Sequence, residues 1–174
     1  MIPVISFVGP HNAGKTTLLE KVIAGLQGRG FKVGVIKHAF HAVVFEEAKK
    51  DSLRLFDAGA TVMTVVSSEV CIEYRRQEGE VDLSQILQRM TSGLDIVLVE
   101  GFKKENLPKI QILRREVSSH LMNLDQTIAV AADFEVEGAE VPVFPLDSSE
   151  QLIGFIVRNF LTCQGLEGEN PQSG

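Results

Sequence analysis

The segment GPHNAGKTT, Gly9–Thr17, directly follows the apolar run IPVISFV and directly precedes a stretch with helical periodicity. The run at residues 2–8 predicts a buried strand, because it is short, rich in branched side chains and bounded by glycine and proline. Apolar residues then recur every three or four positions, which predicts a helix that begins at Thr16 and ends at Gly28. A strand, a glycine-rich loop and a helix in this order predict a phosphate-binding loop.

The loop matches the pattern G-x-x-x-x-G-K-[ST]. Its glycines let the backbone curl so that successive N–H groups point at phosphate oxygens, and the helix N-terminus adds partial positive charge. We expect the Lys15 ammonium to reach the β- and γ-phosphates of a nucleoside triphosphate, and the Thr16 hydroxyl to bind Mg²⁺. The residues expected to line the nucleotide are Gly9, His11, Asn12, Ala13, Gly14, Lys15, Thr16 and Thr17.

A magnesium site of this kind needs a second oxygen ligand, usually an acid at the carboxyl end of a neighbouring strand. The run DIVLVE has Asp95 at its start and Glu100 at its end, which lie roughly 16 Å apart in an extended strand. Ligands bind outside the carboxyl ends of parallel strands, so we predict Glu100 as the magnesium ligand and Asp95 as a turn or edge residue. Lys15 and Glu100 are then the residues that act on the phosphates.

The rest of the chain alternates strands and helices, with one interruption. Further strands are predicted at 31–38, 95–100, 109–114, 127–132 and 141–145, and helices at 51–59, 82–90 and 147–161. The segment 61–76 predicts an antiparallel hairpin. We therefore expect an α/β protein with the P-loop NTPase fold: a three-layer, doubly wound, mostly parallel sheet with an added β-hairpin. Residues 1–164 are expected to form a single nucleotide-binding domain, with a flexible tail at 165–174.

The composition excludes several classes of function. The formal net charge of −6 argues against nucleic-acid and membrane partners, which need a basic excess. Cys71 and Cys163 lie far apart in the sequence, so they signal neither a disulfide framework nor a zinc site. No apolar stretch is long enough to span a membrane, and we expect a cytoplasmic protein.

The motifs GPHNAGKTT, VIKHAFH, KDSLRLFDAGA, VEGFK and PKIQILR occur in an order and spacing that resemble the molybdopterin-guanine dinucleotide biosynthesis protein B family. The resemblance covers about residues 2–135. It implies a GTP-binding adaptor with slow, Mg²⁺-dependent hydrolysis that forms a homodimer. It also implies that the adaptor assists the guanylyltransferase which joins a guanine nucleotide to molybdopterin. The chain departs from the family pattern at Glu46 and Lys49, which leaves residues 43–49 outside what the resemblance implies.

Several polar residues are further candidates for ligand contacts. Lys37, His38 and His41 lie at the carboxyl end of the second strand, the ligand-facing edge, where we expect them to bind phosphate, pterin or the loop backbone rather than a metal. Lys50, Asp51 and Ser52 suit either helix capping or ligand binding. A local basic cluster is a candidate for the phosphate of molybdopterin or a solvated face, and comprises Lys103, Lys104, Lys109, Arg114 and Arg115.

Guanine recognition requires an acceptor for N1–H and N2–H₂, and the common Asn-Lys-x-Asp motif is absent from the sequence. An acid at a late strand end is the natural substitute. Asp133 is the first choice and Asp147 the second. Asp147 also forms, with Glu150, a predicted capping pair for the last helix.

Two other functions fit the same motif. A small-molecule kinase would need an acceptor pocket and a lid carrying arginines, for which Arg75, Arg76, Arg114 and Arg115 are candidates. A nucleotide-regulated structural subunit would bind a partner but no pterin. We also expect the hairpin at 61–76 to offer a strand edge for a two-fold dimer.

Overall fold

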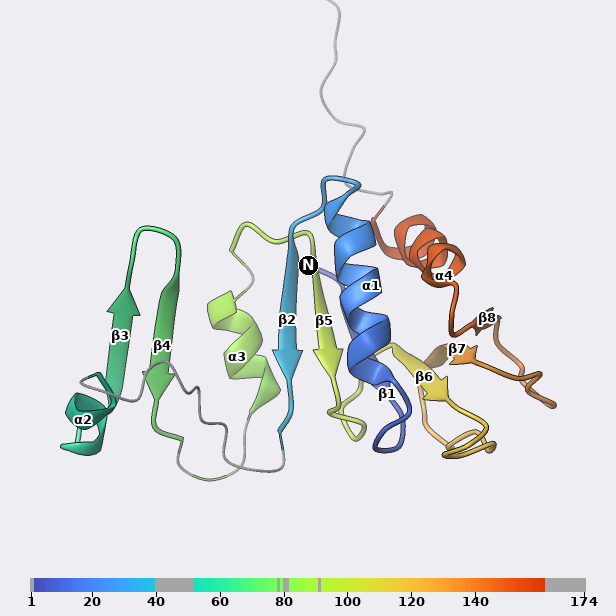
Figure 1. Ribbon diagram of the computed structural model, residues 1–174, viewed down its shortest axis with the longest axis horizontal. Helices are drawn as coiled ribbons and strands as arrows, with labels where there is room; N and C mark the ends of the chain where they lie inside the picture. The colour runs from blue at the N-terminus through green and yellow to red at the C-terminus, as the bar shows by residue number, and fades with distance from the viewer. Residues whose placement is uncertain (1, 40–51, 78, 80–81, 91, 162–174) are drawn as a thin grey trace, which may run out of the picture. The chain divides into compact units, whose positions relative to one another are not determined.

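The structure, a computed structural model, describes residues 2–39, 52–77, 79, 82–90 and 92–161 (Figure 1). The chain forms two compact units: Met1–His38 together with Arg89–Gly174, and Ala39–Gln88. The single domain expected over residues 1–164 stays a prediction. Residues 162–174, which include the whole of the predicted tail, lie outside the described residues.

The larger unit contains a six-stranded sheet in the order β2-β5-β1-β6-β7-β8, and every neighbouring pair in it is parallel. The predicted parallel α/β sheet is therefore confirmed. In Figure 1 the arrows of β2 and β5 point to the end at which the loop between β1 and α1 lies. The strands are β1 (Val4–Val8), β2 (Val33–Lys37), β5 (Ile96–Glu100), β6 (Lys109–Leu113), β7 (Thr127–Ala132) and β8 (Val143–Pro145).

Helices α1 (Lys15–Gln27) and α4 (Ser149–Ile156) cover one face of this sheet, and α4 continues into a π-helical turn, η2 (Val157–Leu161). Figure 1 shows α1 in front of the strands with α4 beside it. Alternate strand residues point toward these helices because side chains in a strand alternate between its two faces. This core includes Ile5, Phe7, Ile96, Leu98, Ile110, Ile112, Leu18, Val22, Leu152 and Ile153.

The start of α4 differs from the sequence prediction. Its N-cap is Ser148, with no side-chain capping hydrogen bond, so the Asp147 and Glu150 capping pair is wrong. The Glu150 carboxylate instead pairs with the guanidinium of Arg29, just beyond the end of α1. A tertiary ion pair has replaced the local bond that the spacing predicted.

The opposite face of the sheet carries three buried polar side chains, from Ser6, Lys109 and Gln111. The Ser6 hydroxyl donates to the Gly101 carbonyl at 2.6 Å. Gln111 bonds both the N–H and the carbonyl of Met122, at 2.9 and 2.8 Å. Loops therefore cover this part of the sheet and are held by specific hydrogen bonds. At the β2 edge the methyl group of Met90 lies against Gly34.

The connection between β5 and β6 is short for two parallel strands. Glu100 and Ile110 lie level with Phe7 on its two sides, so β6 begins at the level where β5 ends. Residues 101–108 therefore need no helix to return the chain to the far end of the sheet, as parallel connections usually do. The same offset carries the end of β6 beyond the end of β1, beside the loop between β1 and α1.

The smaller unit contains α2 (Ser52–Asp57) and the hairpin of β3 (Val62–Val66) and β4 (Cys71–Arg75), whose strands are antiparallel as predicted. Arg76 fixes the hairpin to α2, since its guanidinium donates to the Phe56 and Ala60 carbonyls and covers the Phe56 ring. Helix α3 (Leu83–Met90) follows and ends in the larger unit. Among the described helices, none has the length and apolar character needed to cross a membrane.

Candidate functional site

Two glycines shape the loop between β1 and α1. A Cβ atom on Gly9 would lie 2.6 Å from the Ile112 carbonyl oxygen of β6, closer than real Cβ atoms come to backbone. Gly14 caps α1 with a φ of 90°, in the left-handed region that L side chains rarely adopt. The loop therefore requires its first glycine for close packing against β6 and its second for the turn into the helix.

Lys15, the first residue of α1, folds its ammonium back over the loop. The Nζ atom donates to the Pro10 carbonyl at 2.7 Å and to the Gly9 carbonyl at 3.2 Å. Burial lowers the pKa of Lys15 below 10.5, the Glu100 carboxylate opposes this shift, and the Lys37 ammonium adds to it. The ammonium is thus at the mouth of the loop, partly desolvated and available to an anion.

Thr16, Glu100 and Lys37 meet at the carboxyl ends of β1, β5 and β2. The Thr16 hydroxyl donates to Glu100 Oε2 at 3.1 Å, and Lys37 Nζ lies 3.1 Å from the same carboxylate oxygen and 3.2 Å from Thr16 Oγ1. Asp95, at the other end of β5, accepts instead from the Lys32 backbone N–H at 2.7 Å. Asp95 thus lies in the turn before β5, as predicted, and Glu100 is brought to the loop.

The oxygen atoms of Thr16 and Glu100 suit a hard divalent cation such as Mg²⁺, which takes few protein ligands and keeps several waters. The Lys37 ammonium contacts both oxygens, so a cation of the chain itself already stands at this point. Thr16 and Glu100 would hold magnesium, and the magnesium would polarise the phosphate oxygens bound beside it. Within the described part of the chain, no cluster of three His, Cys, Asp or Glu side chains could hold a metal.

The remaining loop residues divide by burial. His11, Asn12 and Thr17 are exposed, whereas Ala13 is fully buried in the core under α1. Asn12 has a φ of 61°, a left-handed conformation that asparagine tolerates better than most residues. Ala13 can thus offer a ligand only its main chain, while the other three can also offer side chains.

His38 follows β2 and adjoins the loop after Glu100. Its N–H donates to the Glu100 carbonyl at 2.9 Å, and its ring stacks on Phe102 with centroids 4.6 Å apart. Phe102 has a φ of 52°, which is an uncommon conformation for an aromatic residue. The residue in this conformation is the one that stacks on His38. His41, Lys50 and Asp51, with the departures at Glu46 and Lys49, lie outside the described residues.

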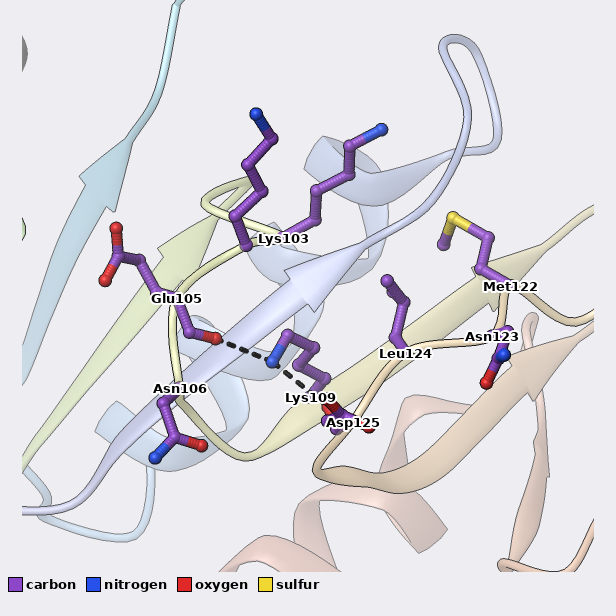
Figure 2. Close-up of a pocket in the computed structure, with 9 residues that line it drawn as sticks. Lys103, Glu105, Asn106, Lys109, Met122, Asn123, Leu124 and Asp125 are labelled. Carbon is purple, nitrogen blue, oxygen red and sulfur yellow. Dashed lines mark hydrogen bonds between the residues drawn. The ribbon is translucent and has the colours of Figure 1, made fainter.

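The basic cluster predicted from the sequence separates into distinct parts. Lys109 is buried, and its ammonium donates to the carbonyls of Glu105, Leu107 and Asp125 at 2.7, 3.1 and 3.1 Å. It therefore holds two loops together, and its inclusion in a surface basic cluster was wrong. Figure 2 shows Lys109 bonded beneath the loop while Lys103 extends away from it.

Lys103 and Lys104 are both exposed and line a cavity of about 560 Å³. The cavity lies between the segment before β7 and the loop after β5. This loop begins directly after Glu100. Its lining comprises Lys103, Lys104, Glu105, Asn106, Lys109, Met122, Asn123, Leu124 and Asp125.

Asp133, the predicted guanine-binding acid, follows β7 at the carboxyl edge of the sheet. Its Oδ1 atom accepts from the Arg115 backbone N–H at 2.8 Å, and its Oδ2 atom lies 3.9 Å from Arg114 Nε. Asp147 lies near α1, where its backbone carbonyl accepts from Lys21 Nζ at 3.5 Å. Their role in guanine recognition stays a prediction.

The sequence predicted Arg114 as part of a basic cluster or of a kinase lid, but did not place it against the loop between β1 and α1. Its Nη2 atom lies 3.6 Å from the point where Gly14 would carry a Cβ. The motif itself contains no signal for it, because the contact depends on how far β6 extends past β1. The one signal in the sequence was the position of Arg114 at the carboxyl end of the predicted strand 109–114, which points to this sheet edge.

The model of the family described as molybdopterin guanine dinucleotide synthesis protein B matches residues 4–133. The Escherichia coli K12 molybdopterin-guanine dinucleotide biosynthesis adapter protein is 38% identical over 164 residues, which covers 90% of this chain and 93% of the relative. The adapter protein of the same description from Haemophilus influenzae is 37% identical over 138 residues, or 78% of each chain.

Solved structures agree with these relatives. A crystal structure of molybdopterin-guanine biosynthesis protein B is 30% identical, with a TM-score of 0.72 and coverage of 89% of this chain and 98% of that one. A MobB homolog from Bacillus stearothermophilus is 29% identical, with a TM-score of 0.68 and coverage of 89% and 95%. The parallel sheet, the loop and these likenesses show a P-loop NTPase α/β fold. The chain belongs to the molybdopterin guanine dinucleotide synthesis protein B family.

Proposed function

We propose that this chain is a cytoplasmic GTP-binding adapter of molybdopterin guanine dinucleotide biosynthesis. The observation that carries the proposal is the convergence of Lys15, Thr16 and Glu100 at one loop, with hydrogen bonds of 3.2 Å or less among these residues and the loop backbone. This is the residue set that binds a nucleoside triphosphate with Mg²⁺. The relatives from Escherichia coli and Haemophilus influenzae supply the pathway, since both are named as adapter proteins of it.

We expect GTP hydrolysis to be slow. Rapid hydrolysis requires a group that orients the attacking water as well as groups that bind the phosphates. The Glu100 carboxylate is engaged by the Thr16 hydroxyl and the Lys37 ammonium, so it is not available as a base. A protein built in this way retains its nucleotide and can present it to a guanylyltransferase partner.

Melting temperatures with different ligands test this proposal. GTP with Mg²⁺ should raise the melting temperature more than ATP does, because the proposed site distinguishes guanine from adenine, and GDP should give a smaller rise. Molybdopterin should give a rise of its own if the adapter binds the pterin. Equal rises with GTP and ATP would contradict guanine selection, while a phosphorylated small-molecule acceptor in the same mixtures would favour a kinase.

The pKa of Lys15 predicts how binding depends on pH. Since burial lowers this pKa below 10.5, the Lys15 ammonium of the free protein loses its proton at a lower pH than an exposed lysine does. Phosphate binds the charged form, so GTP affinity should fall as pH rises through the lowered pKa. Titrations between about pH 7 and about pH 10 measure this fall. In Lys15→Arg, which keeps its charge throughout, the fall should be smaller, because only ionisation of the ligand then remains, and an equal decline in both proteins would contradict the assignment.

We propose that Lys103 and Lys104 attract the phosphate of molybdopterin, because they are the exposed cations that line the cavity between the loop after β5 and the segment before β7. Lys103→Gln with Lys104→Gln should weaken pterin binding about tenfold, as expected for loss of a charge-assisted contact, and should leave GTP binding unchanged. Fluorescence titration with molybdopterin measures the effect. Lys32→Gln, at the amino end of the sheet, is the control, and unchanged pterin affinity in the double variant would remove the idea.

We propose that the chain forms a homodimer through the β3–β4 hairpin, since Val66 and Val70 at its tip are exposed apolar residues. A hairpin edge can pair with the same edge of a second copy about a two-fold axis. Light scattering at micromolar protein should give the mass of a dimer, and the mass of a monomer would contradict the proposal.

A further inference from the structure

We propose that Arg114 binds the phosphate groups of the nucleotide, from the side of the loop opposite to Glu100 and Lys37. The proposal rests on the nucleotide binding proposed above and adds to it a residue outside the G-x-x-x-x-G-K-[ST] pattern. The path of β6, the unused donors of the Arg114 guanidinium and the different surroundings of Arg115 support this role.

Strand β6 continues past the end of β1 and runs beside the loop. Val8, the last residue of β1, is level with Gln111, so Ile112, Leu113 and Arg114 extend along the loop that begins at Gly9. The packing is close at the start of this path, where a Cβ on Gly9 would meet the Ile112 carbonyl at 2.6 Å. β6 is therefore fixed against the loop.

At the end of this path, the Arg114 guanidinium lies beside the turn that leads into α1. A Cβ on Gly14 would lie 3.6 Å from Arg114 Nη2 and 3.9 Å from its Cζ. This is the end of the loop where backbone N–H groups point at phosphates. The fold thus places a permanent positive charge next to the residue that shapes the loop.

The donors of this guanidinium are not used elsewhere in the described part of the chain. The Nε atom is buried and makes no hydrogen bond there, and its distance of 3.9 Å to Asp133 Oδ2 is too long for one. A buried donor without a partner costs free energy, so a ligand oxygen that accepts from it is favoured. Asp133 keeps the guanidinium nearby without saturating it.

Arg115, the next residue, has a different environment. Its guanidinium covers the Phe134 ring at 4.9 Å from the centroid, and its backbone N–H bonds Asp133. The two neighbours carry the same charge at the same strand end, but only Arg114 lies against the loop. Arg115 is accordingly a matched control for any general effect of positive charge.

The chemistry of arginine favours phosphate as the ligand. A guanidinium stays charged at all accessible pH values and offers paired donors that match two oxygens of a phosphate. Lys37 and Glu100 lie on β2 and β5, on one side of β1, whereas Arg114 follows β6 on the other side. The polyphosphate would then be held from both sides of the loop, with Lys15 between them.

The test is calorimetric titration of Arg114→Gln, Arg114→Lys and Arg115→Gln with GTP and with inorganic tripolyphosphate, each with Mg²⁺. Arg114→Gln should raise Kd roughly 10- to 100-fold for both ligands, as expected for loss of a hydrogen bond between charged groups. Arg114→Lys should retain part of the affinity, and Arg115→Gln should stay within about twofold of the parent. Melting temperatures without ligand establish that each variant is folded.

The outcomes separate this proposal from the one on which it rests. If the parent binds both ligands and Arg114→Gln binds them equally well, Arg114 does not contact phosphate and only this inference is overturned. If Arg114→Gln loses affinity for GTP but not for tripolyphosphate, Arg114 contacts the nucleoside and the inference is again overturned. If the parent binds neither ligand, nucleotide binding itself fails and both proposals are overturned.

Discussion

Lys15→Ala should lose most of the thermal stabilisation that GTP gives to the parent protein. GTP at roughly 100 times its Kd stabilises a folded protein by about 2.7 kcal/mol, which raises the melting temperature of a chain this size by several degrees. The Lys15 ammonium lies over the loop within 3.2 Å of two carbonyl oxygens, so it is the cation placed to meet the phosphates there. Differential scanning fluorimetry with and without GTP measures the loss.

The matched control is Lys21→Ala, on the same helix. Within the described residues, Lys21 Nζ donates one hydrogen bond, to the Asp147 carbonyl at 3.5 Å, and makes none to the loop. It should therefore show the full GTP shift. An equal shift in Lys15→Ala and the parent would contradict the role given to the lysine, whatever the ligand-free stability of the variant.

Gly9→Ala should destabilise the folded protein in the absence of any ligand. Its added methyl group would lie 2.6 Å from the Ile112 carbonyl oxygen and 3.4 Å from the Ile112 Cβ, and the backbone atoms of β6 cannot move as a flexible side chain can. Overpacking of this kind costs about 1–3 kcal/mol. Urea unfolding at constant m-value measures the change.

Gly154→Ala serves as the control for Gly9→Ala. Its methyl group would meet only the end of the Arg158 side chain, at 3.2 Å, and alanine is favoured over glycine within a helix by roughly 0.5–1 kcal/mol. This variant should be as stable as the parent or slightly more so. A Gly9→Ala protein with unchanged stability would show that the loop does not depend on its close contact with β6.

Local patterns predicted much of the site, because its main parts are close in sequence or fixed by strand direction. The G-x-x-x-x-G-K-[ST] pattern places Lys15 and Thr16 at the start of α1. Glu100 could be chosen over Asp95 because parallel strands bring their carboxyl ends to one edge of the sheet. The structure places Glu100 in hydrogen-bond contact with Thr16, and the magnesium role of Glu100 stays a prediction.

The parts that were missed depend on tertiary register. Nothing in the run KIQILR shows that β6 is offset from β5, yet this offset brings Arg114 to the loop. Lys109 reads as a surface lysine, but it is buried because three loop carbonyls surround its ammonium. The Asp147 and Glu150 pair fits a capping pattern, but Arg29, from a distant part of the chain, takes the Glu150 carboxylate.

Isothermal titration calorimetry of the unaltered protein with GTP and Mg²⁺ tests whether the loop at Gly9–Thr17 binds the phosphates of GTP with magnesium. We expect a saturable heat with one GTP per chain, and displacement of the bound GTP by inorganic tripolyphosphate. The absence of any binding heat, with no displacement of a fluorescent GTP analogue by unlabelled GTP, would contradict this expectation.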